Sequence, residues 1–266
     1  MIPYCAAMEI VSRTTKDITP VKEAVKWVLE RLDTEPPKAQ IIISDDFDAT
    51  CRAIDPVQYG GLREQYHPTH SAEIVTLLAL NQPTIVVSSA ALDLGKETLA
   101  GKLARSFTFF KYRDLGYLKT IEKANRWALE NLSAGITDFY IVDVGGTFKE
   151  ISVGLLVVEK FPSEHWAARR HSLAQELMSR ATDTPASMGV LEEANRYASA
   201  ARPFRGTAFE AKVLETLDAQ WHIPRDLKDN IMSIYDRFSN PPEEKVLHGI
   251  FKDLVKESIP YLDKLL

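Results

Sequence analysis

The sequence predicts an α/β protein with a small, mostly parallel or mixed sheet of about four strands and flanking helices, followed by a helical C-terminal subdomain. Two observations carry this prediction. Short apolar runs rich in β-branched residues, such as 39–43 and 84–87, alternate with segments of helical periodicity, which is typical of βα units. Beyond Pro162 the pattern is helical throughout.

The first predicted element is a helix over residues 20–32, with Thr19 as its cap and Pro20 at its first position. Its apolar residues recur at helical spacing: Val21, Ala24, Val25, Val28, Leu29 and Leu32. A buried strand over 39–43 follows, and it ends in an acidic segment. We then expect a helix over 71–80 and, after Pro83, a second buried strand over 84–87.

The middle of the chain predicts two helices and two further strands. The helices cover 96–107 and 117–132, and the strands cover 139–142 and 151–158, with a turn at Gly145-Gly146 between them. Further helices are expected over 164–181, 188–201, 208–220, 224–238 and 243–256. These elements suggest an α/β core over 1–162 and a helical subdomain over 163–266 packed on it, or one continuous domain.

Composition excludes several classes of protein. The net charge of -5 disfavours a generally basic nucleic-acid-binding protein. Cys5 and Cys51 are the two cysteines, so a disulfide framework is not expected and a reducing, cytoplasmic location is. The sequence shows no run long enough for a membrane span and no secretory signal, so we expect no membrane contact.

The segment from Ile141 to Thr147 is the first candidate site. An apolar strand would lead into Asp143, and Gly145 and Gly146 would let a ligand approach the backbone closely. The carboxylate could accept hydrogen bonds from ligand hydroxyls, while free N–H groups face the rest of the ligand. The equal alternative is that the two glycines form a hairpin turn.

This segment resembles the first motif of Rossmann-type methyltransferases, most closely that of alphavirus-like RNA-capping enzymes, over about residues 117–180. The resemblance implies a cofactor loop for S-adenosylmethionine made by Asp143, Gly145, Gly146 and Thr147. It also implies that Glu159 holds the ribose. Arg170 would belong to the family's basic downstream motif, although Ala167 replaces its acidic residue. The family's guanylate-accepting histidine has no counterpart, since His70 lies much further upstream.

A second constellation follows the predicted strand over 39–43. Asp46, Asp48 and Thr50 have the spacing of the nucleophile motif of haloacid-dehalogenase-like phosphatases. Ser88 or Ser89 resembles that family's second motif, and Asp143 its final acidic position. Such an enzyme would use one aspartate as nucleophile and others to hold Mg²⁺. An acidic loop that caps a helix explains the same aspartates equally well.

Two surfaces could bind partners. The basic stretch Lys102–Arg126, with interleaved aromatic residues, could bind RNA, although inward-packed aromatics and a charged helix surface are the favoured explanation. The helical subdomain could bind a protein partner or form a homo-oligomer. The leading hypothesis is a methyltransferase-like protein that binds a small nucleotide-type ligand or S-adenosylmethionine, with RNA as its candidate substrate. Its rivals are a non-enzymatic interaction or scaffold protein and the Mg²⁺-dependent phosphatase.

Overall fold

The structure, a computed structural model, describes residues 8–32, 39–57, 74–77, 83–132, 136–180 and 189–262. The chain forms two compact units. Unit 1 comprises Met1–Phe110 and Ser163–Ala181, and unit 2 comprises Lys111–Pro162 and Thr182–Leu266. The division suggested by the sequence, at residue 162, differs from this one in the assignment of residues 111–162.

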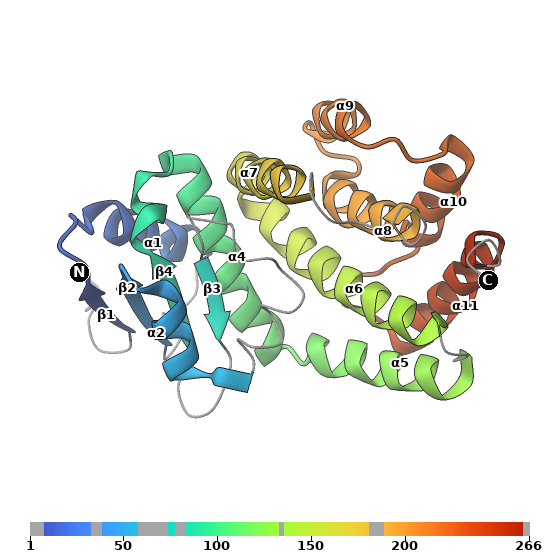
Figure 1. The fold of residues 1–266 in the computed structure, drawn as a ribbon, viewed down its shortest axis with the longest axis horizontal. Helices are drawn as coiled ribbons and strands as arrows, with labels where there is room; N and C mark the ends of the chain where they lie inside the picture. The colour runs from blue at the N-terminus through green and yellow to red at the C-terminus, as the bar shows by residue number, and fades with distance from the viewer. Residues whose placement is uncertain are drawn as a thin grey trace. The chain divides into compact units, whose positions relative to one another are not determined.

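Unit 1 contains a four-stranded mixed sheet in the order β1-β2-β4-β3 (Figure 1). Its strands are β1 (Met8–Arg13), β2 (Ala39–Ser44), β3 (Ile74–Leu77) and β4 (Thr84–Ser88). Strand β2 pairs in parallel with both β1 and β4, and β3 pairs antiparallel with β4. The carboxyl ends of β1, β2 and β4 therefore lie at one edge of the sheet.

Helices of unit 1 bury apolar faces at the sheet and at each other. Helix α1 (Thr19–Leu32) connects β1 to β2, and α2 (Phe47–Ile54) begins after β2. The α2 residues Phe47 and Cys51 form a core cluster with Val86 and Leu77. The remaining described helices are η1 (Ser89–Asp93), α4 (Lys96–Asp114), whose last turn enters unit 2, and α7 (Pro162–Arg180).

Helices α4 and α7 cross at Gly101. A Cβ added to Gly101 would collide with the backbone carbonyl of Glu164, so the crossing depends on a residue without a side chain. His165 is buried near this crossing, and burial is the main reason that its pKa lies well below the usual value. Arg105 and Arg169 lower it further, so His165 is a neutral packing residue.

All regular secondary structure among the described residues of unit 2 is helical. Its helices are α5 (Tyr117–Leu132), α6 (Ile136–Lys160), α8 (Gly189–Ala201), η2 (Arg202–Phe204), α9 (Glu210–Gln220), α10 (Arg225–Tyr235) and α11 (Glu244–Leu262). Helix α6 contacts α5, α8, η2 and α11. Phe148 of α6 packs its ring against Phe251 at 4.9 Å, Phe238 at 5.5 Å and Tyr235 at 6.0 Å between centroids.

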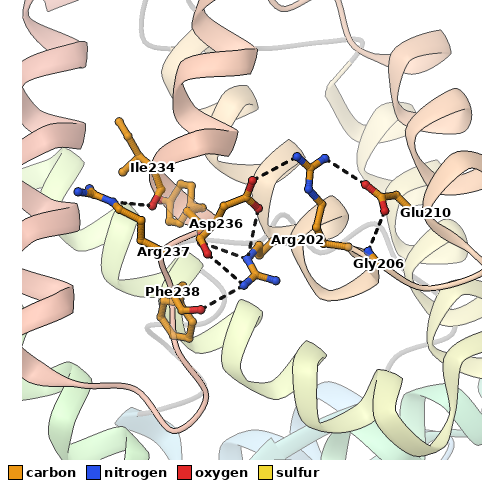
Figure 2. A network of polar contacts seen from close by, with 9 residues as sticks. Arg202, Gly206, Glu210, Ile234, Asp236, Arg237 and Phe238 are labelled. Atoms are coloured by element: carbon orange, nitrogen blue, oxygen red, sulfur yellow. Dashed lines mark hydrogen bonds and ion pairs between the residues drawn. The ribbon is translucent and has the colours of Figure 1, made fainter.

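Arg202 of η2 is hydrogen-bonded to the backbone at the end of α10 (Figure 2). The Arg202 side chain donates to the carbonyl oxygens of Tyr235 at 3.1 Å, Asp236 at 3.3 Å and Phe238 at 3.2 Å. Arg205 bridges Asp236 at 3.2 Å and Glu210 at 3.0 Å. The bonds from Arg202 satisfy carbonyl groups at and after the end of α10, where a helix leaves such groups without partners.

Most of the predicted helices are confirmed, whereas two of the four predicted strands are wrong. The mixed α/β sheet with a helical C-terminal region is confirmed. The strands over 39–43 and 84–87 are confirmed as β2 and β4, and the helix over 117–132 is confirmed as α5. The helix predicted over 71–80 is wrong, because residues 74–77 form β3. Strand β1 was not predicted.

The largest correction concerns residues 136–160. The predicted strands over 139–142 and 151–158 and the intervening turn are wrong, since all of these residues lie in α6. Within α6 the positions 151–154 are buried in succession. Two of the exposed positions of α6, Val142 and Gly146, are not polar, so the sequence shows no clear polar stripe and its β-branched residues favour the prediction of a strand. Among the helices that the structure describes, none combines the length and apolar composition of a membrane span.

Replacing Arg202 by methionine should destabilise unit 2 by about 2–3 kcal/mol, because three carbonyl oxygens lose a charged donor in a setting where the arginine is only 16% exposed. Urea unfolding measures the loss. Arg237→Met is the matched control, since Arg237 is 47% exposed and pairs with Asp253. Equal effects of the two variants would contradict the role assigned to Arg202.

Candidate functional site

The candidate site lies at the carboxyl edge of the sheet in unit 1, where the segments after β1, β2 and β4 meet. Open α/β sheets bind ligands at this edge. After β1, the Thr14 hydroxyl donates to Oδ1 of Asp45, which follows β2, at 2.8 Å. Strand pairing brings Ser44 and Ser88 into register at the ends of β2 and β4. Polar groups far apart in the sequence therefore gather at one place.

Lys16 adds a positive charge to this edge. Its ammonium donates to the Ser89 carbonyl at 3.3 Å and to Asp93 at 2.9 Å, both beyond β4. The Lys16 and Asp93 side chains are 45% and 73% exposed, so their ion pair faces water. An exposed pair of this kind is weak, and a ligand can take over either charge at little cost.

Asp45 is ionised at neutral pH. Hydrogen bonding from the Ser89 side chain is the largest cause of its lowered pKa, and the bond from Thr14 is the next. The result is an exposed carboxylate whose orientation is fixed by hydroxyl donors from two neighbouring segments. A carboxylate held in this way can accept hydrogen bonds from ligand hydroxyl or amino groups.

The predicted phosphatase residues lie at the same edge, but in capping roles. Asp46 caps α2, and its Oδ1 accepts a hydrogen bond from the Ala49 N–H at 3.2 Å. Asp48 lies in the first turn of α2, and the Thr50 hydroxyl is hydrogen-bonded to Ser44 at 2.9 Å. These contacts match the capping alternative that the sequence left open.

Ser88, the last residue of β4, also has a capping role. The buried Ser88 hydroxyl caps η1 by accepting from the Ala90 N–H at 3.3 Å. In the described part of the chain, no three His, Cys, Asp or Glu side chains are grouped so that they could hold a metal ion. The Mg²⁺-dependent reaction stays a prediction.

The second predicted site, around Asp143, has a different structure from the one expected. Asp143, Gly145, Gly146 and Thr147 lie inside α6, so they form neither a strand end nor a glycine loop. Glu159 is exposed near the other end of α6, and the 1.5 Å rise per residue puts it about 24 Å from Asp143. The cofactor loop implied by the resemblance is therefore absent from α6.

The two glycines differ in what surrounds them. A Cβ added to Gly145 would collide with the side chain of Asn125 in α5, whereas one added to Gly146 would meet nothing within 4 Å. Gly145 thus allows α5 and α6 to approach closely. Gly146 has no such role and only lowers the helix propensity of α6.

Asp143 belongs to a polar cluster in the helical unit. The buried Asn195 of α8 donates from Nδ2 to Asp143 Oδ2 at 2.7 Å, and Tyr235 of α10 donates to Asn195 Oδ1 at 3.0 Å. Desolvation is the main cause that raises the pKa of Asp143, to about 6, and Glu192 raises it further. Asn195 and Arg196 act in the opposite direction. The cluster links three helices.

Two other predicted residues lie away from this cluster. Arg170 is exposed on α7, in unit 1. His70 lies outside the described residues. Thr147 is buried and lies in α6, one helical turn after Asp143.

The basic stretch Lys102–Arg126 runs from α4 into α5. Among its aromatic residues, Phe107, Phe110 and Tyr112 are buried, as the favoured explanation expected. Their rings are not available to stack on bases. RNA binding through this stretch stays a prediction.

Sequence reasoning missed Thr14, Lys16 and Asp93 at the sheet edge, and Asn195 and Tyr235 beside Asp143. The first two were missed because β1 was not predicted, although Met8–Val11 contains three apolar residues, two of them β-branched. Comparisons with protein-family models, curated proteins and solved structures give no match for this chain. The methyltransferase and phosphatase resemblances therefore stay predictions.

Alanine at the two glycines should act in opposite directions. Gly146→Ala should stabilise the protein by up to about 1 kcal/mol, because alanine favours a helix and its Cβ has open space. Gly145→Ala should destabilise it by about 1–3 kcal/mol, because Asn125 must move. Urea unfolding compares the two variants. A ligand-binding glycine loop would instead give two folded variants with equal stability and impaired binding.

Asp143 should make unit 2 less stable as pH rises. Because its pKa is raised from 3.8 to about 6 in the folded state, the neutral carboxyl favours folding. This contribution is fully present below pH 3.8 and is lost as pH rises through 6. At about 1.4 kcal/mol per pKa unit, Asp143→Asn should gain about 2 kcal/mol over the wild type between pH 4.5 and 7.5. Parallel pH profiles of the two proteins in urea unfolding would contradict this assignment.

Proposed function

We propose that the protein binds a small nucleotide-type ligand at the carboxyl edge of the sheet in unit 1. The observation that supports this proposal is the convergence of Thr14, Lys16, Asp45 and Ser89 from the segments after three parallel strands. The leading hypothesis from the sequence was a nucleotide-type ligand held around Asp143. The proposal keeps the class of ligand and moves its site to the sheet edge.

The chemistry of the edge matches the two ends of such a ligand. The Asp45 carboxylate can accept hydrogen bonds from ribose hydroxyls or from an amino group. The Lys16 ammonium can pair with a phosphate or a carboxylate, exchanging its exposed contact with Asp93. S-adenosylmethionine, whose amino-acid part carries both charges, remains a candidate ligand. We place this activity in the cytoplasm, in keeping with the low cysteine content.

Thermal unfolding tests the proposal with S-adenosylmethionine, S-adenosylhomocysteine, ATP and GTP, each with and without Mg²⁺. A ligand that binds the native state at 100 times its dissociation constant adds about 2.7 kcal/mol of stability, which is a readily measured shift. We expect at least one of these ligands to raise the melting temperature of the wild type. Asp45→Ala and Lys16→Met should abolish that shift while remaining folded.

The matched control is Asp253→Ala. Asp253 is an exposed aspartate of unit 2 that forms an ion pair with Arg237 at 2.7 Å. This variant should keep the ligand-induced shift in full. A shift that survives in Asp45→Ala, or the absence of a shift with every ligand, would reject the sheet edge as the binding site for these ligands.

A non-enzymatic interaction protein is the second candidate. Four large apolar side chains among the described residues of unit 2 are exposed: Leu115 at 49%, Leu129 at 36%, Val142 at 50% and Ile259 at 48%. Exposed apolar side chains favour contact with a protein partner when they form a patch. The same thermal measurement separates the candidates, because an interaction protein need not respond to any small ligand.

A further inference from the structure

Strand β1 lies at the edge of the sheet in unit 1 (Figure 1). It pairs with β2 on one side, and no strand within the described residues pairs with its other side. Ile10 and Val11 at its centre are each partly exposed. The strand contains neither proline nor lysine, two common means of protecting an edge from pairing, and its charged residues are Glu9 and Arg13.

The outward backbone groups of β1 follow from one hydrogen bond. The Asp45 N–H donates to the Arg13 carbonyl at 3.3 Å, so the backbone of Arg13 faces β2. Because successive residues of a strand point their backbone groups to alternate sides, Val11 also faces β2 while Ile10 and Ser12 face outward. Their N–H and C=O groups form a short template for another strand.

We propose that β1 pairs antiparallel with β1 of a second copy of this chain, about a twofold axis at Val11. In this register Ile10 lies opposite Ser12 of the partner, and each such pair exchanges two backbone hydrogen bonds. A twofold interface is self-complementary, so both pairs form together. The two sheets then join into one continuous sheet, by the same pairing that edge strands use to bind peptides.

Charge complementarity selects this register and this partner. With Val11 on the axis, Glu9 of each copy lies opposite Arg13 of the other, on the same face of the sheet. Both side chains are exposed, and Glu9 has one carboxylate oxygen bonded to Gln40 at 2.9 Å, which leaves the other oxygen for the arginine. A shift of the axis to Ile10 would place Met8 opposite Ser12 and lose both charge pairs. A second copy of the chain therefore supplies the complement of this edge.

Analytical ultracentrifugation of the full chain over a concentration series tests the pairing. The wild type should form dimers at concentrations up to about 100 µM. Ser12→Pro should be monomeric, because proline removes an outward N–H while leaving the bonds to β2 in place. Its melting temperature should stay near that of the wild type, which shows that the variant folds.

A charge exchange tests the register. Glu9→Arg and Arg13→Glu each place like charges opposite one another, and each should raise the dissociation constant about tenfold or more. The double variant restores opposite charges and should regain the wild-type constant. A wild type that is monomeric throughout, a dimer that persists in Ser12→Pro, or a double variant as weak as the single ones would overturn the proposal.

Discussion

The parallel pairing of β2 with β1 and β4 is the constraint on which the arrangement of unit 1 depends. Parallel strands end at a common edge, so the residues that follow each strand meet there whatever their separation in the sequence. This places Thr14 beside Asp45 and Lys16 beside Asp93. The same pairing gives hydrogen-bond partners to the backbone groups on both sides of β2. Within the described residues, it gives partners to the backbone groups of β1 on one side. The ligand edge and the outward-facing strand are thus two results of one hydrogen-bonding pattern.

Unit 2 is organised by a helix instead of a sheet. Helix α6 contacts α5, α8, η2 and α11, and it can be approached closely by α5 because position 145 is glycine. Some polar groups of this unit pair across its helices, as Asn195 shows by bonding both Asp143 and Tyr235. Arg202 does the same for the carbonyl groups after α10. Asn195 and Arg202 therefore join helices of unit 2 to one another.

The sequence was informative where periodicity and environment agree. Helices α1 and α5 each have an apolar face and a polar face, and β2 and β4 are short β-branched runs, so their patterns match their burial. Strand β3 has four residues, too few for a period to be recognised. Helix α6 was misassigned because its exposed positions include Val142 and Gly146, which are not polar, so the amphipathic signal is weak and β propensity is the remaining local guide.

The candidate site was predictable in part for a related reason. Asp46, Ser88 and Ser89 were identified because they follow β2 and β4, which were recognised as strands. Thr14 and Lys16 follow β1, which was not. Asp143 was assigned to a strand end only because of the error in α6, and its true neighbour Asn195 is 52 positions away in the sequence. Long-range contacts of this kind carry no signal in a single sequence.

The composition of α6 also has a consequence for aggregation. Residues 151–158 carry no charge and no proline, and valine, isoleucine and leucine make up six of the eight. Segments with high β propensity, no charge and no proline are an aggregation hazard when they are exposed. The helices packed around this segment bury part of it, so opening of the bundle would expose a segment with a composition typical of strands. During synthesis, packing of the helices around α6 therefore competes with pairing of this segment between chains.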